Sequence, residues 1–261
     1  MIPRFTKENN QDPKIWDEFE TFGFGFIEIP SEFTGERRQF VKDNFTILFG
    51  LSNLVSNFPN ESLPESRLKD LSSEEKPFSA IKLEMSPESI LGFVDTPHTQ
   101  GHLATIRSTL MEIGDIMSGR WQKFLPPSFF DMKEIEENFN AMFFPEDRDH
   151  LDGLDPHCPE GLLTIMDVFN HNSLQYWDPL LLSWCDLVQP ENHITIMIGK
   201  EFQEIIGRNK IMTPLIRVKS CQLNSLMLGY HVSQKKKVTF HDEDEDEWEF
   251  TILPKTATLS D

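Results

Sequence analysis

The chain has 261 residues, of which 38% are hydrophobic, and a formal net charge of −19 at pH 7. This length allows a large core, and the charge argues against nucleic-acid binding and against attachment to anionic membranes, because both need clustered cations. Three scattered cysteines, an N-terminus without an apolar leader, and the lack of any apolar run near about 18 residues predict a protein that is cytoplasmic or nuclear and not secreted.

The N-terminal part is expected to be helical, with a few strands. Apolar residues at helical spacing end at Gly23, and a short β-prone run then ends at Pro30. The longest helical pattern is stopped by Pro126 and Pro127. The sequence predicts helices over 11–24, 31–51, 99–124 and 129–138, a strand over 24–30 and a loop over 52–77, while 78–95 is ambiguous.

From Phe139 onward, short apolar runs alternate with turn residues, which is typical of a β-sandwich or jelly roll. A helix over 201–206 ends at Gly207, and the acidic run 242–247 is expected to be solvated. The strands are predicted over 139–144, 162–169, 173–177, 184–188, 193–198, 210–218 and 224–232, with a last candidate over 248–253.

Several short motifs follow one another in a recognisable order. They are GFGF at 23–26, NAMFFP at 140–145, HCPEGLLTI at 157–165, NSLQY at 172–176, ITIMIG at 194–199, and TP and RV at 213–218. Their order and spacing resemble the isopenicillin-N-synthase-like branch of the iron(II)- and 2-oxoglutarate-dependent dioxygenases. The resemblance is weak over most of the chain and clearer over 138–230.

The resemblance implies an α+β protein with a mainly β core, namely a double-stranded β-helix (jelly roll) with a helical N-terminal region. Residues 1–137 would form that helical region, with a few strands packing on the core. Residues 138–232 would form the jelly-roll core, and 233–261 an acidic C-terminal segment.

The family binds iron through two histidines and one carboxylate. His157 matches the first histidine. Pro159 stands at the position of the carboxylate and Ile216 at that of the second histidine, or Leu215 if the register slips by one. At neither of these two positions can the side chain bind iron, in either register, so the resemblance implies a vestigial metal site.

The co-substrate site is altered in the same way. The family pairs 2-oxoglutarate with an Arg-x-Ser motif, in which the arginine binds a carboxylate. Ser225 matches the serine, but Leu223 replaces the arginine, and no Arg or Lys lies between Lys219 and Lys235. No cofactor is therefore predicted, and Fe2+ with 2-oxoglutarate is the alternative.

Substitute ligands are still conceivable. Asp155 and Glu160 flank His157 and could supply a carboxylate, and His231 or His241 could supply a displaced histidine. The simpler interpretation is that a carboxylate beside a lone histidine is its hydrogen-bond partner.

These residues predict a catalytically degenerate dioxygenase-fold protein with a binding or scaffolding role. Its partner would be a protein, for which the net charge of −19 favours a basic one, or a small apolar ligand in the former cleft. The alternatives are an active oxidoreductase with relocated metal ligands and an acidic-tail adaptor for a basic protein.

Overall fold

The structure is a computed structural model. It describes residues 2–6, 8–43, 67–70, 81–85, 97–125, 129, 134–144, 154–169, 173–207, 210–219, 225–235, 237–241 and 247–251. The predicted elements that fall between these ranges, including residues 44–50 of the second helix and most of the 52–77 loop, lie outside the described residues.

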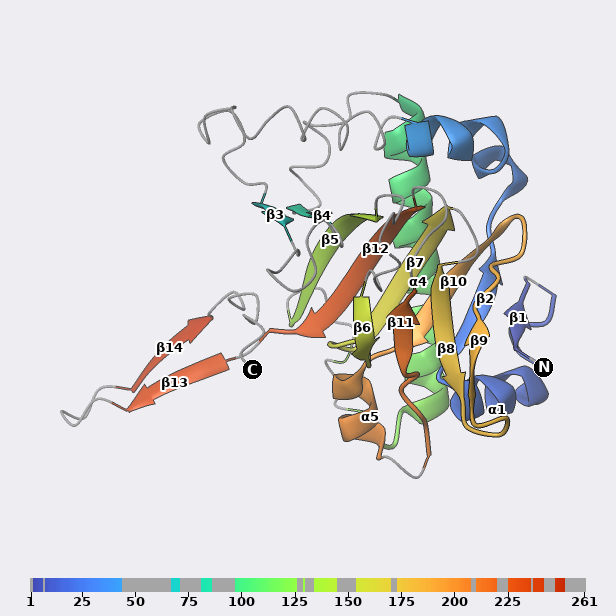
Figure 1. The fold of residues 1–261 in the computed structure, drawn as a ribbon. Helices are drawn as coiled ribbons and strands as arrows, with labels where there is room; N and C mark the ends of the chain where they lie inside the picture. The colour runs from blue at the N-terminus through green and yellow to red at the C-terminus, as the bar shows by residue number, and fades with distance from the viewer. Residues whose placement is uncertain are drawn as a thin grey trace.

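The larger sheet has eight strands in the order β1-β2-β10-β7-β12-β5-β4-β3 (Figure 1). Its central strand, β12, pairs antiparallel with β5 and β7. The strands are β1 (Arg4–Phe5), β2 (Phe24–Glu28), β3 (Arg67–Asp70), β4 (Ile81–Met85), β5 (Ile135–Phe144), β7 (Leu163–Phe169), β10 (His193–Ile198) and β12 (Ser225–Gln234).

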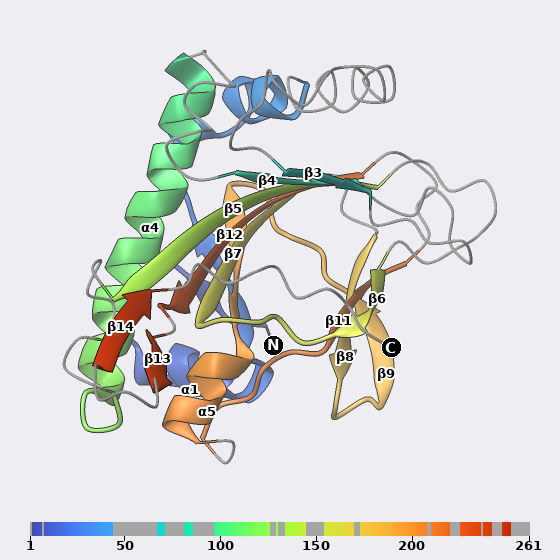
Figure 2. The ribbon, with the colours of Figure 1, turned by 90° about the vertical axis from the view of Figure 1, so that its left-hand side faces the viewer.

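The smaller sheet has four strands in the order β6-β11-β8-β9 and lies opposite the concave face of the larger one (Figure 2). Its strands are β6 (Leu154–His157), β8 (Leu174–Asp178), β9 (Ser183–Asp186) and β11 (Ile216–Val218). A separate antiparallel pair joins β13 (Lys237–His241) and β14 (Glu247–Thr251).

An apolar cluster fills the space between the two sheets, and we call it the interior cluster. Side chains alternate across each strand, so β12 turns Met227 toward this cluster and Leu226 and Leu228 toward the opposite face. The buried members are Phe24, Phe26, Met142, Phe144, Met166, Val168, Leu174, Tyr176, Leu187, Met197, Ile216, Val218 and Met227.

The convex face of the larger sheet is covered by α1 (Pro13–Phe22) and α4 (Pro97–Trp121) (Figure 2). Helix α1 begins at Asp12, whose side chain accepts a hydrogen bond from the Lys14 backbone N–H at 3.0 Å. It ends at Gly23, which has the left-handed conformation (φ 70°) that glycine adopts without steric cost. Trp16 of α1 packs edge-on against Trp121 of α4, with ring centroids 5.7 Å apart.

Most of the predicted elements are confirmed, with shifted ends. Helices α1, α4 and α5 (Lys200–Ile206) lie where the pattern places them, as do strands β2, β7, β8, β9, β10 and β12. The helix predicted from 31 appears as a 3-10 helix, Ser31–Phe33, followed by helical residues 36–43. The last candidate strand is β14, and the strand predicted over 210–218 is reduced to β11.

Two predictions are wrong. The helix predicted over 129–138 overlaps β5, which begins at Ile135 and pairs with β12 along its whole length. The polar residues Glu136 and Asn138 do not indicate a strand in the sequence. The segment is nevertheless a strand, because pairing with the central strand β12 outweighs local preference. The loop predicted over 52–77 contains β3, and β6 was not predicted at all. Among the described helices, none has the length and hydropathy needed to cross a bilayer.

Candidate functional site

His157 is the last residue of β6, at one edge of the smaller sheet. Its ring Nδ1 lies 2.8 Å from the backbone carbonyl oxygen of Asp155. A carbonyl oxygen can only accept, so Nδ1 carries the proton of this hydrogen bond, and Nε2 is the ring nitrogen left to act as a ligand. One nitrogen donor therefore remains at the position that matches the family's first metal ligand.

Ile216, which stands where the family has its second histidine, is the cross-strand partner of His157. Directly opposite residues of an antiparallel pair place their side chains on the same face, about 5 Å apart. Ile216 is 3% exposed and belongs to the interior cluster. On its other side it is paired with Tyr176 of β8. The structure thus places the two positions side by side, and the second side chain is a hydrocarbon.

Pro159, at the position of the family's carboxylate, lies in a turn held by the start of α5. The backbone N–H of Lys200 donates to the Pro159 carbonyl at 3.0 Å, and that of Glu201 donates to the Gly161 carbonyl at 3.0 Å. A Cβ at Gly199 would lie 2.1 Å from the Gly161 carbonyl oxygen, so only glycine fits there. Pro159 is itself buried, and its place in the fold is structural.

Ser225, which matches the serine of the family's co-substrate motif, faces the interior from the first position of β12. Its hydroxyl donates to the Phe169 carbonyl at 3.2 Å and lies 3.0 Å from the Ser173 hydroxyl. The side chain is 1% exposed. Its hydrogen bonds are therefore made within the protein. Leu223 lies outside the described residues.

The substitute ligands do not converge on His157. Asp155 and Glu160 are exposed. His231 contacts Thr164, with Nδ1 2.9 Å from Oγ1, and the side chain of His241 lies outside the described part. Within the described ranges, no three His, Cys, Asp or Glu side chains lie together in a way that could hold a metal ion. The residues at the three matched positions do not fit the facial triad that the fold family implies.

Burial also shapes the acid–base behaviour of the interior. Burial, followed by the neighbouring Cys185 and Asp178, raises the pKa of Tyr176 to about 12. The phenol therefore stays neutral through the physiological range. Its ring packs on Phe24 at a centroid distance of 4.8 Å, beside Ile216 in the same sheet.

A polar network lies on the outer face of the smaller sheet, around Asp186. Asp186 accepts from Gln175 at 2.7 Å and from Lys219 at 2.9 Å, and these hydrogen bonds lower its pKa. Arg217 donates to Gln175 at 2.9 Å, and its guanidinium lies 4.3 Å from the ring centre of Trp184.

Sequence reasoning missed a buried ion pair between Arg38 and Asp167. The carboxylate is fully buried and accepts from Arg38 at 2.6 Å and from the amide of Gln189 at 2.9 Å. Gln189 in turn accepts from the hydroxyl of Thr195 at 2.9 Å. The partners are 129 residues apart in sequence, and no local pattern could have linked them.

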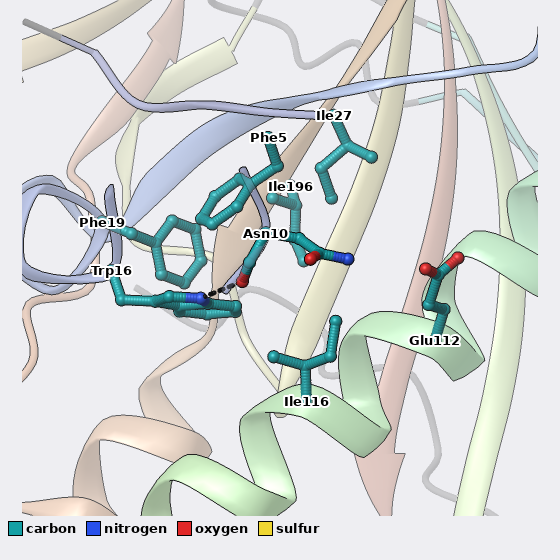
Figure 3. A pocket seen from close by; sticks show the side chains of 8 residues that line it. All are labelled: Phe5, Asn10, Trp16, Phe19, Ile27, Glu112, Ile116 and Ile196. Atoms are coloured by element: carbon teal, nitrogen blue, oxygen red, sulfur yellow. Dashed lines mark hydrogen bonds between the residues drawn. The ribbon is translucent and has the colours of Figure 1, made fainter. Parts of the chain in front are cut away.

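A small cavity lies on the other face of the larger sheet, away from the interior cluster (Figure 3). Its volume is about 30 Å³, which suffices for a water molecule but not for a co-substrate. The Trp16 indole N–H points along its wall and donates to the Asn10 carbonyl at 2.7 Å. It is lined by Phe5, Asn10, Trp16, Phe19, Ile27, Glu112, Ile116 and Ile196.

No family model matches the sequence, and no curated protein matches it. Solved structures do resemble the fold. The dioxygenase for auxin oxidation 1 from Arabidopsis thaliana, as its 2-oxoglutarate complex, is 16% identical, with a TM-score of 0.70 and coverage of 90% of this chain and 94% of that one.

Two further structures agree with it. The dioxygenase for auxin oxidation in rice is 12% identical, with a TM-score of 0.64 and coverage of 88% of this chain and 82% of that one. JOX2 in complex with 2OG, Fe and JA is 16% identical, with a TM-score of 0.64 and coverage of 90% and 75%. At these identities the likeness concerns the fold. The chain therefore has the fold of the iron- and 2-oxoglutarate-dependent dioxygenases.

Proposed function

We propose that the chain is a catalytically degenerate protein built on the dioxygenase double-stranded β-helix, and that its role is binding or scaffolding. The observation that carries the proposal is the pairing of Ile216 with His157. A residue that should bind iron is an aliphatic side chain, 3% exposed, which packs among the phenylalanines and methionines of the interior cluster.

The surroundings of Pro159 and Ser225 are compatible with this proposal. The Pro159 side chain has no atom that can bind a metal, and its carbonyl accepts from the N-terminus of α5. Ser225 is hydrogen-bonded to Phe169 and Ser173. A single neutral imidazole binds iron(II) weakly, because affinity depends on several ligands in a fixed geometry.

A protein partner is favoured over a small apolar ligand in the former cleft. The interior cluster draws its side chains from both sheets, so the space between them is occupied by the protein's own core. The net charge of −19 supports a basic partner, toward which it would steer association over long range. Cys158 and Cys185 are free thiols, which fits the expected cytoplasmic or nuclear compartment.

The test has two parts: an anaerobic titration of the purified chain with iron(II), with and without 2-oxoglutarate, followed by calorimetry, and a separate aerobic assay for consumption of 2-oxoglutarate. We expect no stoichiometric iron site and no consumption above that of free iron.

Stoichiometric iron that disappears in the His157→Ala variant would instead establish an active site with relocated ligands. His193→Ala is a matched control, because His193 also places its ring Nδ1 against a backbone carbonyl two residues earlier, that of Glu191 at 2.7 Å. It should leave any metal binding unchanged.

A further inference from the structure

The hairpin between β8 and β9 ends in three consecutive exposed leucines. Leu180 is 77% exposed, Leu181 66% and Leu182 73%. We call these residues the leucine tip. Figure 2 shows the hairpin extending below the level of β11, so the tip projects from the body formed by the two sheets.

The tip is held in one conformation by its own turn. The Asp178 carboxylate accepts from the backbone N–H groups of Leu180 at 2.8 Å and of Leu181 at 3.1 Å. Leu182 has a φ of 50°, a left-handed conformation that leucine rarely adopts. The fold thus accepts backbone strain at a position where it presents an apolar side chain to solvent.

The base of the hairpin is equally fixed. Trp177 and Trp184 are cross-strand partners, and their rings meet edge-on at a centroid distance of 5.6 Å. The Arg217 guanidinium lies over Trp184. The leucines are therefore displayed by a rigid support, which lowers the entropy that a binding partner must offset.

We propose that the leucine tip is a docking element that inserts into an apolar pocket of a basic protein partner. Contiguous exposed apolar surface on a folded protein marks an interaction site, and a projecting hairpin is convex, so it fits a concave partner. The net charge of −19 supplies the complementarity that selects a basic partner. The inference names the partner class for the binding role proposed above and rests on that role.

Two other occupants fit the charges less well. A lipid surface would need cations beside the tip, but Arg217 contacts Gln175 and Trp184 while Lys219 contacts Asp186, all on the face of the smaller sheet. A second copy of the chain would bring together two bodies that each carry −19. Like charges of this size oppose self-association.

The experiment uses the full chain with a photo-crosslinking residue at Leu181, and a control chain with the same residue at Met111, which is 50% exposed on α4. Proteins from a lysate that crosslink at position 181 but not at 111 are identified and purified. Each is then titrated with the wild-type chain, with the Leu180→Ser/Leu181→Ser variant and with Met111→Ser. Because all three sites are exposed, the variants keep the fold, which circular dichroism checks.

We expect at least one identified protein with a positive net charge. The Leu180→Ser/Leu181→Ser variant should weaken its Kd at least tenfold and Met111→Ser less than twofold, and Kd should rise with added salt. The proposal is overturned if no protein crosslinks selectively at 181, or if the double variant binds as tightly as the wild type.

It is also overturned if the tip binds neutral phosphatidylcholine vesicles or vesicles with added phosphatidylserine, or if sedimentation detects a dimer that the double variant abolishes. If the leucine tip binds no partner and the chain binds no iron, the docking proposal is wrong, but the proposal of a catalytically degenerate protein stands. If the chain has a catalytic iron site and the leucine tip still binds its partner, the proposed function is wrong, but the role of the leucine tip as a docking element stands.

Discussion

Ile216 of β11 lies directly opposite His157 of β6, and the family resemblance matches each of these positions to a metal-binding histidine. The two side chains share a face of the smaller sheet, but only the histidine is at the edge strand, while Ile216 is flanked by β6 and β8 and is buried. Ile216 therefore extends the apolar core to the position that the family resemblance matches to a metal ligand.

If Ile216 is a core residue, shortening it must cost stability. We expect Ile216→Ala to lower the free energy of unfolding by about 2–4 kcal/mol and Ile216→Val by about 0.5–1.5 kcal/mol. Urea unfolding followed by tryptophan fluorescence measures both. A loss below about 1 kcal/mol for Ile216→Ala would mean that the position borders an open pocket.

The turn that holds Pro159 depends on two glycines that touch. A Cβ at Gly199 would lie 2.1 Å from the Gly161 carbonyl oxygen. That oxygen already accepts a hydrogen bond from the backbone N–H of Glu201 in α5. We expect Gly199→Ala to destabilise the protein by about 1–3 kcal/mol or more. Gly119→Ala is the control, because Gly119 is at an exposed position of α4 where an added Cβ meets nothing within 4 Å, and this variant should be more stable by about 1 kcal/mol. Thermal unfolding of both variants measures the two changes in stability.

The sequence predicts the elements whose burial pattern is simple. Strands β7 and β10 are buried almost throughout, so their runs of apolar residues mark them. Strand β5 was missed in its first half because Glu136, Glu137 and Asn138 are three consecutive polar residues, which places polar side chains on both faces and removes the apolar alternation. Burial raises the pKa of Glu136, although nearby Lys235 partly offsets the effect.

The contacts around the candidate site could not be predicted from the sequence. The resemblance alone matches Pro159 and Ile216 to ligand positions, and it says nothing of what these residues touch. Ser225 forms hydrogen bonds with Phe169 and Ser173, and the Pro159 carbonyl accepts a hydrogen bond from the start of α5. These contacts join segments about 40–56 residues apart, which only the fold brings together.

Tyr176 should make stability fall in alkaline solution. Its folded pKa of about 12 lies above the usual value near 10, so its contribution is complete below about pH 10 and is lost as the pH rises toward 12. In that window the free energy of unfolding should fall by about 1.4 kcal/mol per pH unit from this group. Urea unfolding of wild type and Tyr176→Phe at matched pH measures the difference. If the free energy of unfolding falls equally steeply with pH in the two proteins, Tyr176 is not the group responsible.

The buried pair of Arg38 and Asp167 should respond to truncation far more than its exposed neighbour does. Arg38→Met leaves a fully buried carboxylate without its cation, and we expect a loss of about 3–5 kcal/mol. Arg37→Met, at an exposed residue one position earlier, should change stability by less than about 0.5 kcal/mol. Adding Asp167→Asn to Arg38→Met removes the stranded charge, so the double variant should recover part of the loss. If the losses in free energy of unfolding of the two single variants simply add up in the double variant, the residues act independently. That result would contradict the contacts of 2.6 and 3.1 Å between them.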